Sequence, residues 1–235
     1  MPKPFEKWTV LPHKPIRKLE DNLWLVDGLL GNIRRVMVVV RLADQRLLIW
    51  NGIALDEPEM KELEAWGTPA FLVVPNGLHR MDARIYKERY PSLTVIAPPG
   101  ARPKIEQIVK VDRTTGDVGD DRVKIAFPAC TRERDTTLEV RHADNSVTLV
   151  LNDLVMNMRH QPGFGGFMFR MMGFTADTPN VPLPTRMLLI KDKPGLKTLL
   201  GQMAATPKLK RVIVSHGEML EANAGEGLRQ AVDTF

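Results

Sequence analysis

The sequence is poor in the residues that usually build metal centres and disulfide frameworks. It contains one cysteine, Cys130, and only five histidines. A single cysteine excludes an internal disulfide and a cysteine-rich zinc ribbon. With so few imidazoles, a metal site in this chain would need carboxylate ligands as well.

Long hydrophobic runs and several familiar motifs are also missing. No window approaches the ~18 to 20 continuous apolar residues of a membrane helix. The N-terminus lacks the apolar core of a signal peptide, which predicts a cytoplasmic protein. No RNP-type, helix-turn-helix or zinc-finger pattern is present, so nucleic acid is not an expected partner. The chain also has neither a P-loop nor a Gly-x-Ser-x-Gly nucleophile elbow.

What remains is the composition of a folded globular protein. The 235 residues are 43% apolar and 26% charged, with a net charge of +5. Residues 1–20 carry five Lys or Arg against two Glu, a net charge of +3. We therefore predict a basic N-terminal arm over 1–20, followed by a single domain over 21–235.

Strand and helix patterns alternate along that domain. Apolar β-branched runs flank short turns at 44–45 and 144–145, which predicts two antiparallel hairpins. Helix signals begin at Asp56 and Met81 and recur near 196–205 and 220–232. The pattern predicts an α/β domain with sheets sandwiched between helices. A doubly wound parallel sheet is the competing architecture, and the hairpins argue against it.

Polar residues follow three of the apolar strands. His79 and Asp82 come after the strand at 70–75, Asp153 after the strand at 146–152, and His216 after the strand at 211–215. Ligand sites of open α/β sheets gather at such strand ends. Imidazole and carboxylate together suit zinc or iron. A histidine in this position can equally be a hydrogen-bonded structural residue.

The order of these elements resembles the metallo-β-lactamase superfamily. The similarity spans about residues 20–217 and is greatest to a branch with a Pro-Asn-x-x-His element. It implies a four-layer αββα sandwich with a metal site at one edge of the two sheets. It further implies that Asp153 matches the metal-bridging aspartate and His216 the late histidine ligand. His79 and Asp82 fall in the first motif, His-x-His-x-Asp-His.

The sequence departs from this motif at several positions. If Asp82 is aligned with the aspartate of the motif, Leu78, Arg80 and Ala83 stand where the family has histidines. Cys130, in Pro128-Ala129-Cys130, takes the place of the middle histidine. A cationic Arg80 would repel a metal if it pointed inward. These departures predict one metal ion or none instead of two.

Two functions follow as hypotheses. The first is a hydrolase with one zinc or iron ion on His79, Asp82, Asp153 and His216. In it, a bound water attacks an ester, thioester or similar bond of a small-molecule substrate, and Asp153 orients that water as a base. The second is a non-catalytic binding protein that retains the fold with a vestigial site and no metal. The sequence leaves open whether Cys130 and Glu139 line the pocket or have a structural role alone.

A segment rich in Gly, Met and Phe lies between these motifs, at 156–174. Met-rich surfaces adapt to varied partners. The segment is predicted to form a mobile lid, a homodimer contact or a membrane-surface segment. Core packing behind the site is the alternative.

Overall fold

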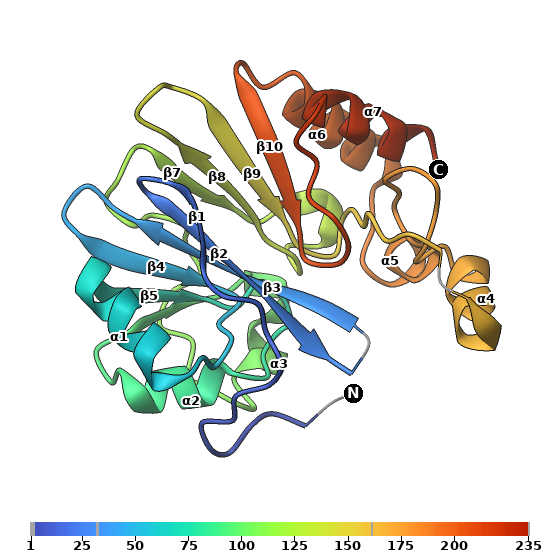
Figure 1. The fold of residues 1–235 in the computed structure, drawn as a ribbon. Coiled ribbons are helices and arrows are strands. Elements are labelled where there is room, and N and C mark those ends of the chain that lie inside the picture. Colours follow the sequence, from blue (N-terminus) through green and yellow to red (C-terminus); the bar gives the residue numbers. More distant parts are fainter. Residues whose placement is uncertain (1–2, 32, 161, 235) are drawn as a thin grey trace. The chain divides into compact units, whose positions relative to one another are not determined.

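The computed structural model describes residues 3–31, 33–160 and 162–234. The chain divides into two compact units, Met1–Ala126 and Phe127–Phe235. Each unit contains strands and helices of its own (Figure 1). The prediction of a single domain over 21–235 stays a prediction.

The first unit is built on a mixed sheet with the strand order β1-β2-β3-β4-β5-β6. The first four strands pair antiparallel in succession, whereas β5 and β6 are added in parallel. The strands are β1 (Arg17–Glu20), β2 (Leu23–Leu30), β3 (Ile33–Arg41), β4 (Arg46–Trp50), β5 (Thr68–Val73) and β6 (Thr94–Ile96).

This sheet contains the first predicted hairpin. β3 and β4 pair antiparallel around the turn, where Gln45 takes a left-handed φ of 69°. The predicted basic arm is partly structured as well, because β1 lies within residues 1–20 and pairs with β2. Farther upstream, His13 forms a bridge with Gly28 of β2. Part of the arm therefore extends the sheet.

Helices α1 and α2 lie on one face of this sheet (Figure 1). α1 starts where the sequence predicts, after Asp56 and with Pro58 in its first turn, and it ends at Gly67. Proline fits there because its missing N–H is not needed in the first turn. The other elements of the unit are α1 (Glu57–Trp66), α2 (Ala83–Arg89), η1 (Pro99–Ala101), α3 (Arg102–Ile105) and β7 (Val123–Ala126).

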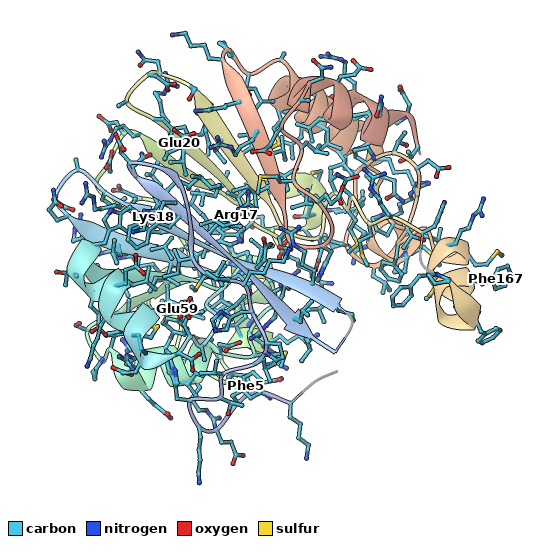
Figure 2. The ribbon with its side chains drawn as sticks, viewed as in Figure 1. Phe5, Arg17, Lys18, Glu20, Glu59 and Phe167 are labelled. Carbon is cyan, nitrogen blue, oxygen red and sulfur yellow. The ribbon has the colours of Figure 1, made fainter. Side chains whose placement is uncertain are left out.

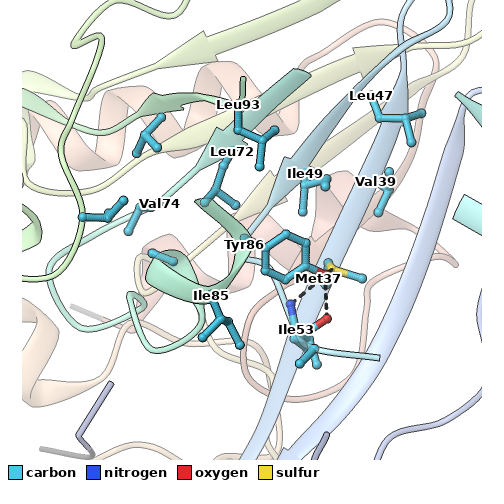
Figure 3. Packing of buried hydrophobic residues seen from close by; sticks show 14 of the residues in the cluster. Met37, Val39, Leu47, Ile49, Ile53, Leu72, Val74, Ile85, Tyr86 and Leu93 are labelled. Carbon is cyan, nitrogen blue, oxygen red and sulfur yellow. Dashed lines mark hydrogen bonds between the residues drawn. The ribbon is translucent and has the colours of Figure 1, made fainter. Parts of the chain in front are cut away.

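Tyr86 joins α2 to the core of this unit through its hydroxyl. The hydroxyl donates to the Ile53 carbonyl at 2.7 Å and lies 3.3 Å from the Met37 sulfur (Figure 3). The Tyr86 side chain is fully buried. The hydroxyl therefore satisfies a carbonyl that water does not reach.

We expect Tyr86→Phe to lower the free energy of unfolding by about 1–3 kcal/mol, because it leaves the Ile53 carbonyl without its donor. Urea denaturation measures this loss. Tyr90→Phe is the matched control, since its hydroxyl bonds to Glu64 at an exposed position. An equal effect of the two substitutions would contradict this role of Tyr86.

The second unit has a smaller sheet, with β9 between β8 and β10. β8 and β9 form the second predicted hairpin, in which Asn145 has a φ of 62°. β10 runs parallel to β9. The strands are β8 (Thr137–Arg141), β9 (Val147–Leu151) and β10 (Leu209–Val214); the helices are η2 (Ala129–Thr131), α4 (Gly163–Met171), α5 (Leu183–Leu188), α6 (Lys193–Ala204) and α7 (Ala224–Asp233).

The apolar core of the second unit lies between β9 and β10 on one side and α6 and α7 on the other. Leu149 and Val212 of the strands belong to the same buried cluster as Leu200 of α6 and Leu228 of α7. In neither unit do the described residues form a helix long and apolar enough to cross a membrane.

Candidate metal site

Asp153 and His216 follow the two parallel strands of the second unit. Leu151 at the end of β9 pairs with Val214 at the end of β10. The Ser215 amide donates to the Leu151 carbonyl at 3.1 Å and extends this pairing by one residue. Because the two strands run parallel and in register, the residues that follow them emerge at the same sheet edge.

The structure brings these two predicted ligands together. His216 Nε2 lies 3.4 Å from Asp153 Oδ1, and their side chains are only 14% and 10% exposed. Two ligands at about 2.1 Å from a tetrahedral zinc ion would stand about 3.4 Å apart. The pair therefore has the spacing and donor chemistry to share one cation.

A buried carboxyl that the sequence analysis did not select supports this pair. Asp135 accepts hydrogen bonds from the Asn152 amide at 2.9 Å and from the Asp153 backbone N–H at 3.2 Å. Ser215 Oγ in turn donates to Asn152 Oδ1 at 2.8 Å. Asp135 thus fixes the chain at the end of β9 and connects it to the end of β10.

Asp135 is completely buried. Burial, and next the charge of Asp153, raise the pKa of this carboxyl well above its usual value. Its place before β8, in a segment without a motif, gave no sequence signal for this role.

Gly217 completes the turn after His216. It has a φ of 102°, a region that favours glycine. It forms a bridge with Asn157, whose N–H donates to the His216 carbonyl at 3.1 Å. A Cβ at position 217 would collide with the Asn157 backbone. The backbone that carries His216 is therefore held against a neighbouring segment of the same unit.

His79 lies in the first unit, in a turn organised by Asn76. The Asn76 side chain accepts from the N–H groups of Leu78 at 2.7 Å and His79 at 3.0 Å. The Arg80 side chain donates to the Lys104 carbonyl and, at 3.2 Å, to Gln107. Arg80, which stands where the family motif has a histidine, is thus held by α3 and by Gln107, two residues after its end.

Asp82, the other predicted ligand of the first unit, is engaged elsewhere. Its Oδ2 accepts from Arg35 Nη1 at 2.6 Å, and its Oδ1 accepts from the Ala54 N–H at 3.1 Å. Burial raises the pKa of Asp82 more than the charge of Arg35 lowers it. Both carboxylate oxygens have partners within the first unit, which is the environment of a structural ion pair.

Comparison with known proteins rests on structure alone, since no protein-family model and no curated protein matches the sequence. The solved structure of DIM-1 metallo-β-lactamase superposes with a TM-score of 0.61 at 10% identity, over 95% of this chain and 99% of that chain. TMB-1, studied for substrate and inhibitor binding, gives a TM-score of 0.59 at 12% identity, over 95% and 98% of the two chains. The chain has the metallo-β-lactamase fold.

The resemblance proposed from the sequence is confirmed at the level of the fold. The predicted class, an α/β chain of the αββα metallo-β-lactamase type, is confirmed with it. Structural similarity at 10–12% identity establishes the fold but not the reaction. The activity must therefore be argued from the side chains of the candidate site.

Cys130 and Glu139 belong to the second unit of this metallo-β-lactamase fold. Cys130 is part of the buried apolar cluster, and burial raises the pKa of its thiol. A raised pKa disfavours the thiolate that a metal ligand requires. Glu139 of β8 is half-buried and lies 3.8 Å from Arg141. These surroundings fit a packing role for Cys130 and a strand-surface ion pair for Glu139.

A second group of metal-type ligands occurs in the first unit. One ligand atom from each of His13, Asp56 and Glu59 lies within 4.8 Å of the others. His13 Nε2 is 3.5 Å from Glu59, which makes the pair an ion bridge between the arm and α1 when the imidazole is protonated. This group lies at the start of a helix, where carboxylates are common without a metal. It supplies a control for any test of His216.

Proposed function

We propose that the chain is a hydrolase of the metallo-β-lactamase fold with a single zinc or iron ion, held by Asp153 and His216. The 3.4 Å separation of His216 Nε2 and Asp153 Oδ1 at two adjoining strand ends is the observation that carries the proposal. His79 is the further ligand that the sequence predicts, and it stays a prediction. We leave Asp82 out of the set because Arg35 and Ala54 occupy its carboxylate.

Each residue of the pair has a separate task. His216 would hold the ion through Nε2, which requires the proton of its imidazole to reside on Nδ1. Asp153 would supply negative charge to the ion through Oδ1, and its carboxylate would orient a water and accept a proton from it as a base. Asp135 and Asn152 hold Asp153 in place through the hydrogen bonds described above. When bound, such an ion supplies the Lewis-acid chemistry that favours hydrolysis of an ester or thioester.

The experiment is metal analysis of the full chain after dialysis against zinc or iron(II). We expect about one ion per chain, because two ligands at tetrahedral spacing and a third predicted ligand suit a single ion. His216→Ala should lose the ion, whereas His13→Ala should keep it. Retention by His216→Ala with loss in His13→Ala would place the ion in the first unit and overturn the proposal.

A second candidate function is a non-catalytic binding protein that uses the same fold. The observation that favours it is the exposure of large apolar side chains on α4 and α5, with Phe164 80% exposed. Wild-type protein that binds neither zinc nor iron(II) would support this candidate over the hydrolase.

A further inference from the structure

The predicted Gly-, Met- and Phe-rich segment contains a helix, α4, with an exposed apolar face. Phe164, Phe167, Met168 and Met171 are between 40% and 80% exposed. Their spacing of three, four and seven residues places them on one side of the helix. Gly166 is the buried residue of α4. The apolar side of the helix is thus its outer side.

α4 is a regular helix that packs against the residues that follow it. Phe174 packs against Phe169 edge to face with ring centroids 5.6 Å apart. The Phe174 N–H donates to the Phe169 carbonyl, and Gly173 turns the chain with a φ of 69°. Within its unit the helix projects away from the sheet and from α6 and α7, and the Phe167 ring points outward (Figures 1 and 2). The apolar face is therefore held in an exposed position.

α5 contributes more exposed apolar surface. Leu183 is 47% exposed, Met187 72% and Leu188 74%. Exposed large apolar side chains on two helices of one unit are typical of an interaction surface. We call the exposed apolar residues of α4 and α5 the apolar face.

The charge of the segment that carries these two helices favours an anionic partner. Residues 163–193, which contain α4, α5 and the turn into α6, carry four Lys or Arg and two Asp, a net charge of +2. An isologous dimer through 156–174 would bring two such segments together and oppose like charges. An anionic bilayer surface complements the charge and accepts the apolar side chains as well.

We propose that the apolar face docks the protein on an anionic lipid surface. The Phe and Met side chains of α4 enter the boundary between headgroups and acyl chains. Arg170 of α4 and the exposed Lys191 and Lys193 that follow α5 face the anionic headgroups. The helix lies on the bilayer and does not cross it.

Co-sedimentation of the full chain with lipid vesicles tests this proposal. One set contains phosphatidylcholine alone, and the other contains equal parts of phosphatidylcholine and phosphatidylserine. We expect binding to the second set, much weaker binding to the first, and release when salt is raised, because salt screens the headgroup charge. Equal binding to both sets, or binding to neither, would overturn the proposal.

Variants separate the contribution of the apolar side chains to vesicle binding from the contribution of the charged side chains. Phe164→Ser combined with Phe167→Ser should weaken binding at least tenfold, since two rings no longer leave water. Arg170→Glu should weaken it roughly tenfold, because the charge changes by two. Leu29→Ser and Lys110→Glu change exposed residues of the first unit and should leave binding unchanged.

Sedimentation velocity without lipid decides between the bilayer and a second copy. We expect a monomer whose mass is the same for wild type and for the Phe164→Ser, Phe167→Ser variant. A wild-type dimer that this variant dissociates would show that the apolar face binds another copy, and would overturn the proposal.

Discussion

Replacing Asp82 by Ala should lower the free energy of unfolding by about 3–5 kcal/mol, the cost of leaving a buried charge without its partner. Arg35 donates to Asp82 at 2.6 Å, and the side chains are 9% and 2% exposed. Arg35 Nε and Nη2 are buried and have no hydrogen-bond partner among the described residues. The guanidinium therefore depends on Asp82 for compensation of its charge.

Chemical denaturation measures this loss, and Glu57→Ala is its control. Glu57 also pairs with an arginine, Arg89, but its side chain is 55% exposed. Removing such a surface pair should cost about 1 kcal/mol or less. Equal effects of the two substitutions would contradict the structural role assigned to Asp82. Loss of metal from a folded Asp82→Ala protein would instead restore Asp82 to the ligand set.

Replacing Asp135 by Ala should weaken metal binding about 10–100-fold, the usual effect of removing a residue that orients a ligand. The substitution frees the Asn152 amide and the Asp153 N–H, so the carboxylate that faces His216 loses its fixed position. It also removes a buried carboxyl with a raised pKa. The free energy of unfolding should therefore change less than two lost hydrogen bonds alone would imply.

Competition with a chelator of known affinity measures this change. Glu139→Ala is the matched control, because Glu139 lies in β8 of the same sheet and pairs with Arg141 instead of the end of β9. We expect its metal affinity to equal that of the wild type. Unchanged affinity in Asp135→Ala would contradict the positioning role of Asp135.

The sequence predicts the hairpins and the first helix well because their signals are local. The turns at 44–45 and 144–145 separate β-branched runs, and Asp56, Pro58 and Gly67 mark the ends of α1. Residues 163–171 show the opposite case. Three glycines lower the helix propensity there, yet the segment forms α4. Within α4 the strong helix formers are Met168, Arg170 and Met171, so local propensity does not explain this helix.

Only part of the candidate site could be predicted from the sequence, because some of its residues depend on partners that are distant along the chain. Asp153 and His216 stand at strand ends, and parallel strands in register bring them together. Asp82 also follows a strand, but its carboxylate is hydrogen-bonded to Arg35, 47 residues upstream. Asp135 has no signal, because its importance comes from hydrogen bonds to Asn152 and Asp153. Partners that are distant in sequence decide which carboxylates are available to a metal.

The metal content of the full chain, purified without a histidine tag and reconstituted with zinc or iron(II), tests the proposed metal site most directly. A single tetrahedral site on Asp153 and His216 predicts about one ion per chain. Less than about a tenth of an equivalent after reconstitution would contradict it, because Asp153 and His216 would then be a hydrogen-bonded pair without a metal.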